Sequence, residues 1–136
     1  MRFDTKIAIV VRGDLPVWQK LNVTAFLASG VAGGIPGLVG KPYEDASGNG
    51  YLEMFRQPVL VYAADSEAIA GAHRRALARN LPAAVYTHEL FATDNDDDNR
   101  AAVLEVSAEN LNLAGLAVHG PRNVVDKVLT GLALHP

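Results

Sequence analysis

The chain has 136 residues, the size of one domain with its own core. Hydrophobic residues make up 49 % of it and charged residues 20 %, a composition typical of globular proteins. The chain has no cysteine, which excludes disulfides, thiolate metal sites and a cysteine nucleophile and agrees with a cytoplasmic location. The net charge of −3 indicates no basic face for nucleic acid, and no signal peptide or membrane-spanning stretch is expected.

The first half of the chain predicts a strand, a helix and a second strand. Residues 6–12 are a continuous apolar run rich in β-branched side chains, which indicates a central strand buried on both faces. Residues 18–32 are predicted to form a helix and residues 33–50 a glycine-rich loop. A second buried strand is expected at residues 57–63. The buried stripe expected on the helix consists of Val23, Phe26, Leu27, Gly30 and Val31.

The second half continues the alternation. A helix capped at Asp65 or Ser66 is predicted to bury Ile69, Ala72, Ala76 and Leu77. Strands at residues 83–87 and 113–118 follow, separated by an acidic loop around residues 94–98 and a segment, residues 100–106, whose pattern does not decide between helix and strand. A last helix opens at Pro121. Residues 1–136 are therefore expected to form a single α/β domain, a three-layer α/β/α sandwich whose first three strands are parallel.

Two stretches of the sequence resemble type 2 peptidyl-tRNA hydrolases. These are the opening strand and turn, residues 6–15, and the segment 115–134 with its Gly120-Pro121 turn. The chain is most similar to an uncharacterised bacterial offshoot of that superfamily, although residues 38–56 and 94–110 align poorly with it. The resemblance implies a mixed four-stranded sheet of order 2-1-4-3, a homodimer, and a hydrolase that acts without a cofactor and has tRNA as a partner.

The resemblance also implies a set of catalytic positions. The family has a lysine and, seven residues later, a histidine on one face of the first helix, and these positions are Asn22 and Ser29 in this sequence. Glu89 and Thr93 keep the spacing of a carboxylate and a hydroxyl after the third strand. With Glu89 as base and His88 in place of the missing imidazole, the candidate catalytic residues are Asn22, Glu89, Thr93 and His88.

Four further residues are candidates for binding a ligand. Lys20 lies near Asn22 on the helix, Trp18 offers a ring for stacking, Ser29 shares the face of Asn22, and His119 ends a strand beside the Gly-Pro turn. Each has an alternative structural explanation. The helix face could instead pack closely on a neighbour, with Ser29 bonded back to a carbonyl, and Trp18 could belong to the core or an interface.

Three functions follow as hypotheses. Because residues 22, 26 and 29 have lost the family's side chains, we expect a divergent protein that binds a small molecule or an aminoacyl-type ligand between the first helix and the segment after the third strand. The alternatives are a hydrolase of an ester or amide bond such as peptidyl-tRNA, and a non-enzymatic dimeric interaction module. Residues 94–105 place oxygen side chains at positions 1, 3, 5 and 12 of a calcium loop, but no helix is predicted before them, so we expect a solvated acidic loop and no metal site.

Overall fold

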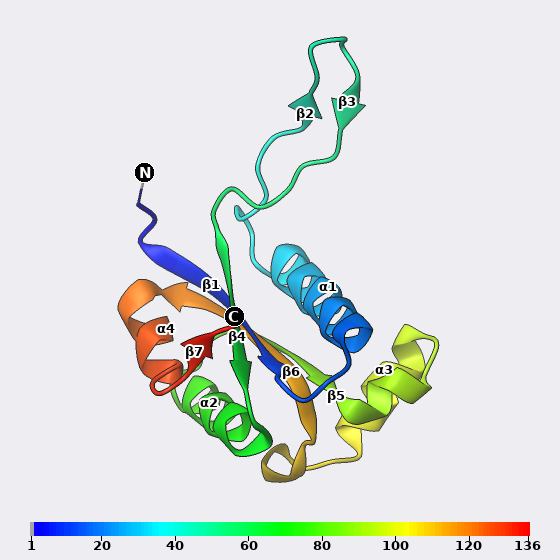
Figure 1. The fold of residues 1–136 in the computed structure, drawn as a ribbon, viewed down its shortest axis with the longest axis vertical. Helices are drawn as coiled ribbons and strands as arrows, with labels where there is room; N and C mark the ends of the chain where they lie inside the picture. The colour runs from blue at the N-terminus through cyan, green and yellow to red at the C-terminus, as the bar shows by residue number, and fades with distance from the viewer. Residues whose placement is uncertain (1) are drawn as a thin grey trace.

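A mixed sheet of five strands forms the centre of the computed structural model, which describes residues 2–136 (Figure 1). The strands lie in the order β5-β6-β1-β4-β7. Their bounds are Thr5–Arg12 for β1, Val59–Ala64 for β4, Ala83–Thr87 for β5, Leu113–Pro121 for β6 and Ala133–Leu134 for β7.

Strand directions follow from the pairing. β1 is parallel to β4, and both β1 and β5 are antiparallel to β6. The first three long strands, β1, β4 and β5, therefore run in the same direction, as their connections through helices predict. The sequence predicted four strands, and the fifth corrects that number: Ala133 and Leu134 pair with Ala63 and Tyr62 of β4. A strand of two residues has no periodicity from which it could be predicted.

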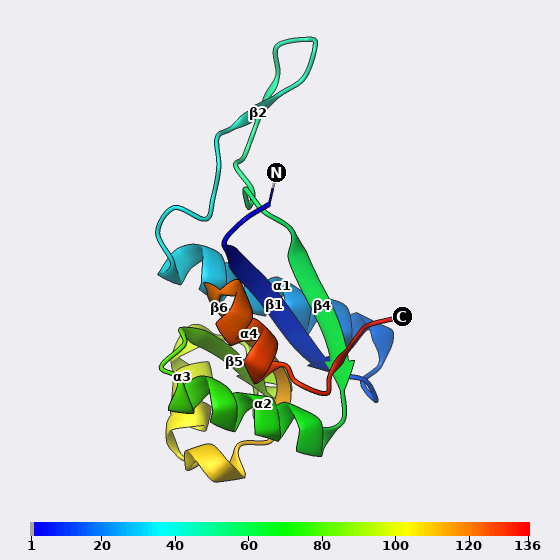
Figure 2. The same cartoon turned by 90° about the vertical axis from the view of Figure 1, so that its left-hand side faces the viewer.

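Helices cover both faces of the sheet (Figure 2). α1 packs on one face, and α2 and α4 pack on the other. α3 lies beside the edge strand β5 and follows the short 3-10 helix η1 (Figure 1). The bounds are Val17–Gly34 for α1, Ser66–Ala78 for α2, His88–Ala92 for η1, Asp96–Leu104 for α3, Ala108–Asn110 for the 3-10 turn η2, and Arg122–Val128 for α4.

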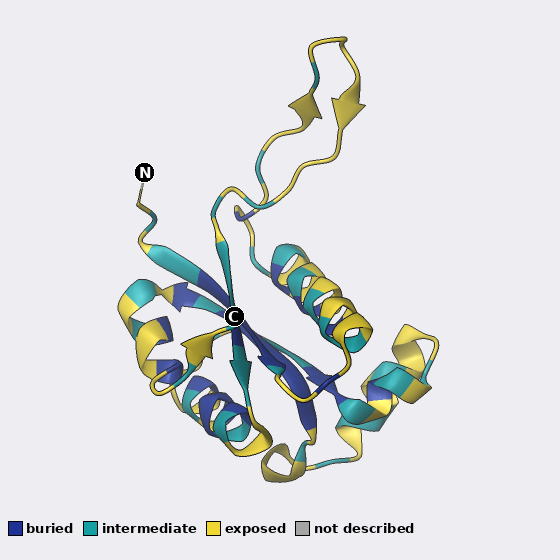
Figure 3. Ribbon diagram, in the orientation of Figure 1, coloured by how far each residue is buried: buried dark blue, intermediate teal, exposed yellow. Residues whose placement is uncertain are grey.

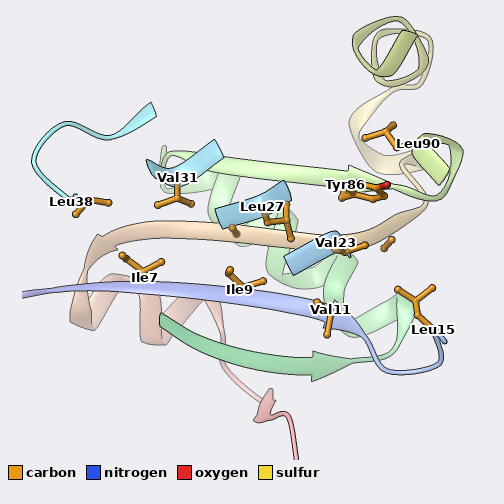
Figure 4. Packing of buried hydrophobic residues seen from close by; sticks show 12 residues of the cluster. Ile7, Ile9, Val11, Leu15, Val23, Leu27, Val31, Leu38, Tyr86 and Leu90 are labelled. Atoms are coloured by element: carbon orange, nitrogen blue, oxygen red, sulfur yellow. The ribbon is translucent and has the colours of Figure 1, made fainter. Parts of the chain in front are cut away.

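Strand β1 contributes to the core on both of its faces because its side chains alternate. Ile7, Ile9 and Val11 pack against the α1 side, whereas Ala8 and Val10 pack against the α2 and α4 side. The α1 side is completed by Val23, Leu27 and Val31 (Figure 4). The burial pattern expected for a central strand is thus present, and β1 and β6 are the most deeply buried part of the chain (Figure 3).

Three residues predicted to be buried, Phe26, Gly30 and Leu77, are exposed. Phe26 is 53 % exposed and Leu77 is 49 % exposed. In each helix the wholly buried stripe is narrower than the apolar stripe of the sequence, because the sheet covers only the residues that face it directly. Phe26 lies on the flank of α1, and this flank faces α3 across an opening described below.

Two predicted loops have regular structure. The acidic segment does not remain a loop: Asp96, Asp97 and Asp98 form the first turn of α3, where carboxylates interact favourably with the helix dipole, and Asn95 caps the helix. The glycine-rich segment is a projecting hairpin whose strands are β2, Tyr43–Glu44, and β3, Gly50–Tyr51 (Figure 1). Among residues 2–136, none of the helices combines the length and the apolar character needed to cross a bilayer.

Candidate functional site

A groove runs between α1 and α3, above β5 and η1. One half has a volume of about 500 Å³ and is mostly apolar, and the other has a volume of about 430 Å³ and is more polar. Phe26, Tyr86 and Leu90 line both halves, so the two form one continuous opening, which we call the α1–α3 groove. Its apolar half also includes Leu27, Gly30, Val85, Val103 and Leu104, and its polar half also includes Trp18, Asn22, Phe91, Thr93, Asp94 and Asn95.

The helical repeat of α1 explains which of its side chains reach the groove. Trp18, Asn22, Phe26 and Gly30 recur every four residues and so lie along one stripe. This stripe is next to the buried stripe of Val23, Leu27 and Val31, which holds the helix on the sheet. Packing of one stripe therefore fixes the position of the other, and the groove wall belongs to a rigid element.

Aromatic rings form a continuous wall along the groove. The Phe91 ring centroid lies 6.1 Å from that of Trp18 and 5.0 Å from that of Tyr86, and Phe26 lies 5.8 Å from Tyr86. The Trp18–Phe91 and Phe26–Tyr86 pairs meet edge to face, an arrangement favoured by the ring quadrupoles. Burial raises the pKa of the Tyr86 phenol. The wall thus offers apolar, stackable surface beside polar groups.

The opposite wall is held together by hydrogen bonds of η1 and α3. The Thr93 hydroxyl donates to the Leu90 carbonyl at 3.0 Å and also contacts the Asn99 side chain of α3. Asn95 accepts a hydrogen bond from the Asp98 backbone amide at 2.8 Å and so caps α3. Thr93, Asn95 and Asn99 all line the groove, which places several neutral hydrogen-bonding groups at its polar half.

Three of the residues predicted from sequence meet in this groove. Asn22 and Trp18 reach it from α1, and Thr93 reaches it from the segment after β5. Glu89, which was expected to act as a base beside them, is exposed on η1 and lines neither half. The structure therefore brings together the amide, the hydroxyl and the indole, but not the carboxylate.

His88 lies at the carboxyl end of the sheet, next to Arg12. The Arg12 Nη1 atom is 3.3 Å from His88 Nε2, and since an arginine can only donate, Nε2 is the acceptor in this contact. Arg12 also forms an ion pair with Asp14 at 2.8 Å, and this hydrogen bond lowers the pKa of the Asp14 carboxyl. His88 meets the aromatic wall at Phe91, where the two ring centroids lie 5.9 Å apart in an edge-to-face arrangement.

The remaining predicted residues lie in three different surroundings. Lys20 Nζ lies 3.2 Å from His135 Nε2 near the carboxyl terminus. The Ser29 hydroxyl donates to the Phe26 carbonyl at 2.6 Å, within its own helix. His119 lines a separate hollow of about 190 Å³ between the end of α1 and the start of β5. Its Nε2 is buried without a hydrogen-bond partner among the described residues, and burial lowers its pKa.

Several groove residues were not predicted as part of a site. Tyr86 lies in a predicted strand and Phe91 between Glu89 and Thr93, and neither was proposed as a site residue, while Asn99 belonged to a segment expected to be a loop. The spacing of aromatic residues 18, 26, 86 and 91 carries no signal by itself, because they come from separate elements. Only the packing of α1 beside η1 brings them together.

The fold and the groove define a three-layer mixed α/β domain with an opening of small-ligand size beside its edge strand. The chain belongs to the DUF2000 family, described as a protein of unknown function, which it matches over residues 5–136. It is also similar to a solved structure of a protein of unknown function from Agrobacterium tumefaciens strain C58. The two are 43 % identical over 99 % of this chain and 100 % of the other, with a TM-score of 0.96. A comparison with curated proteins gave no match.

Proposed function

We propose that this protein binds a small amphipathic ligand of the aminoacyl type in the α1–α3 groove and does not act chemically on it. The observation that carries the proposal is that Phe26, Tyr86 and Leu90 line both halves of the opening. One ligand can therefore place an apolar body against the aromatic wall while its amide or ester group reaches Asn22 and Thr93. Apolar pockets with a few placed polar groups are the usual form of small-ligand sites.

The polar half favours a neutral or cationic head group. Asp94 lies in this half and Asp96 lines both halves, where it forms an ion pair with Arg100 of the apolar half. A polyanion such as tRNA gains most of its affinity from unpaired basic side chains that contact phosphates. The acidic groove mouth therefore supports a free aminoacyl compound better than it supports tRNA.

Hydrolysis is the alternative, and it shares Asn22 and Thr93 with the binding proposal. It requires a base that positions water beside the scissile bond. Glu89 lies outside the groove, and the His88 ring lies against Arg12. These two groups, which were expected to activate water, are therefore not directed toward the Asn22 amide and the Thr93 hydroxyl. For this reason we propose ligand binding, and not hydrolysis, as the function.

Trp18 is the only tryptophan of the chain and lines the polar half, so its fluorescence reports directly on this site. Titration with N-acetyl-L-leucine amide and N-acetyl-L-leucine ethyl ester is expected to change Trp18 emission in a saturable way. Asn22→Ala should weaken binding about three- to tenfold, the loss of one ligand hydrogen bond. No saturable change at millimolar probe would contradict the proposal, and release of N-acetyl-leucine from the ester would favour the hydrolase.

Ser29→Ala provides a matched control. Ser29 lies two turns after Asn22 on the same helix, but its hydroxyl bonds back to Phe26 and it lines neither half. Binding of both probes should therefore be unchanged in this variant. Equal losses in Ser29→Ala and Asn22→Ala would show that general damage to α1, and not a lost contact, explains the effect.

A further inference from the structure

The hairpin between α1 and β4 projects from the body of the protein. We call residues 38–56 the arm, and Figures 1 and 2 show it standing clear of the sheet and helices in both views. At its base Val39 bridges Phe55, and the Gly40 amide donates to the Met54 carbonyl at 2.9 Å. Leu38 is buried in the core on the α1 side. The arm is thus anchored at one end only.

The tip of the arm has its own hydrogen-bond network. Asp45 accepts hydrogen bonds from the backbone amides of Ser47 at 2.9 Å and Asn49 at 3.0 Å, and from the Tyr51 hydroxyl at 2.7 Å. Gly48 has a φ of +88°, a conformation that disfavours a residue with a side chain. These features hold the turn in one shape, so the arm presents its side chains in a preorganised arrangement.

Large apolar side chains are concentrated on this projection. Leu52 is 84 % exposed and Met54 is 59 % exposed, and Tyr43 and Tyr51 are at least half exposed. An isolated two-stranded hairpin is marginally stable in water, and contiguous exposed apolar surface commonly marks an interaction site. The arm therefore has the properties of a surface that a second molecule covers.

The charges of the arm indicate what kind of molecule covers its apolar side chains. Lys41 and Arg56 lie toward the base, where Lys41 is accompanied by Glu53, whereas Glu44 and Asp45 lie at the tip. The base is therefore positive overall and the tip is negative. A two-fold axis perpendicular to the arm would place each tip beside the base of the other arm. Such an isologous contact pairs opposite charges twice and covers the apolar side chains of both arms.

We propose that two copies of this chain associate through their arms, which lie antiparallel with each tip beside the other's base. The inference does not depend on the family resemblance, which aligns poorly over residues 38–56. It is also independent of the proposed ligand. The arm leaves from the C-terminal end of α1, whereas Trp18 and Asn22 lie in its N-terminal half, so the polar half of the groove stays open in such a dimer.

Sedimentation velocity of the full chain between 1 and 200 µM tests the proposal. The wild-type chain should be a dimer over part of this range, and Leu52→Asp should raise the dissociation constant at least about tenfold, equivalent to about 1.4 kcal/mol. Leu104→Asp is the matched control, because Leu104 is a leucine of similar exposure, 87 %, on α3 outside the arm. It should leave the dissociation constant unchanged. Circular dichroism melts verify that both variants are folded.

A charge exchange tests the antiparallel arrangement. Glu44→Lys and Lys41→Glu should each weaken the dimer about three- to tenfold at low salt, and the double variant should bind more tightly than Lys41→Glu alone, because the repulsion between the tip and the base is then removed. A wild-type chain that stays monomeric to 200 µM would overturn the proposal. So would a dimer that Leu52→Asp does not weaken, since it would use another surface.

Discussion

Gly115 of β6 lies directly beneath Val23 of α1. A β-carbon built on Gly115 would stand 2.5 Å from Val23 Cγ1, closer than real contacts allow. It would also stand 2.8 Å from a methyl group of Leu27 and 3.2 Å from the carbonyl oxygen of Val10. The missing side chain at this position thus sets how closely α1 approaches the sheet, and with it the position of the helix flank that lines the groove.

Replacing this glycine should destabilise the protein. Gly115→Ala is expected to lower the free energy of unfolding by about 1–3 kcal/mol, because overpacking a filled core shifts side chains or backbone. Urea denaturation followed by circular dichroism measures this change. Gly33→Ala is the control. A β-carbon built on Gly33 would have no atom of residues 2–136 within 4 Å, apart from its own helix and its chain neighbours. This substitution should raise stability by up to about 1 kcal/mol through helix propensity, and equal effects in both variants would contradict the close-packing argument.

The ion pair between Lys6 of β1 and Asp126 of α4 should stabilise the fold. The two groups are 2.7 Å apart, and the Lys6 side chain is only 11 % exposed. Burial by itself would lower the pKa of Lys6, but hydrogen bonds with Asp126 and Tyr62 outweigh it and raise the pKa above 10.5. The resulting stabilisation is complete below pH 10.5 and is lost as the pH rises through the raised value.

Asp126→Asn should therefore lower the free energy of unfolding at pH 7 by about 1 kcal/mol, near the upper limit for a partly exposed pair. Asp97→Asn is the comparison, because Asp97 pairs with Arg100 on the surface of α3 and is itself almost fully exposed. Its effect should be below about 0.5 kcal/mol. A larger loss of unfolding free energy in Asp97→Asn than in Asp126→Asn would contradict the stabilising role of the pair between Lys6 and Asp126.

Two histidines should make stability decrease in mild acid. Burial lowers the pKa of His73, and nearby Arg74 lowers it further; burial also lowers the pKa of His119. Because the unfolded chain then binds protons more readily, the stabilisation is complete above pH 6.5 and declines as the pH falls below this value, by at most about 1.4 kcal/mol per pH unit for each group. Urea denaturation between pH 5 and 8 gives the slope.

The double variant His73→Gln/His119→Gln should have a shallower slope over this range, whatever its absolute stability. Titration of the histidine ring resonances by NMR checks the same point directly and should place the pKa of both residues below 6.5. Ring resonances of either residue titrating above 6.5 would show that burial does not control its protonation.

Loss of the cap of α3 should loosen one wall of the groove without unfolding the domain. Of the described residues of α3, none is buried, and Asn95 supplies its N-cap. Asn95→Ala should cost about 1 kcal/mol of helix stability, seen as faster amide exchange in residues 96–104 with an almost unchanged global transition. Asp65→Ala removes the equivalent cap from α2, which is packed in the core, so here the global transition itself should shift by about 1 kcal/mol.

Local periodicity accounts for most of the architecture. The β-branched run at residues 6–12 and the helical spacing of Val23, Leu27 and Val31 identify elements that the structure places in the core. Predictions were wrong for the two-residue strand β7, the helix α3 and the exposed side chain of Phe26. Strand β7 forms by pairing with β4, and Phe26 lies at a groove shared with α3, so both depend on neighbours distant in sequence. Helix α3 instead begins at its local cap, Asn95, within a polar segment that has no apolar periodicity.

The sequence by itself determined the mixed α/β fold and its buried strands, whereas the expectation that Asn22 and Thr93 share one opening came from the family resemblance. Only the tertiary structure decided that this opening is lined by Phe26, Tyr86 and Phe91, that Glu89 lies outside it, and that residues 38–56 project as an arm. The physical reason is that hydrophobic alternation acts between neighbours along the chain, whereas a groove is the space left after separate elements have packed. Its lining depends on distances between residues that no local pattern relates.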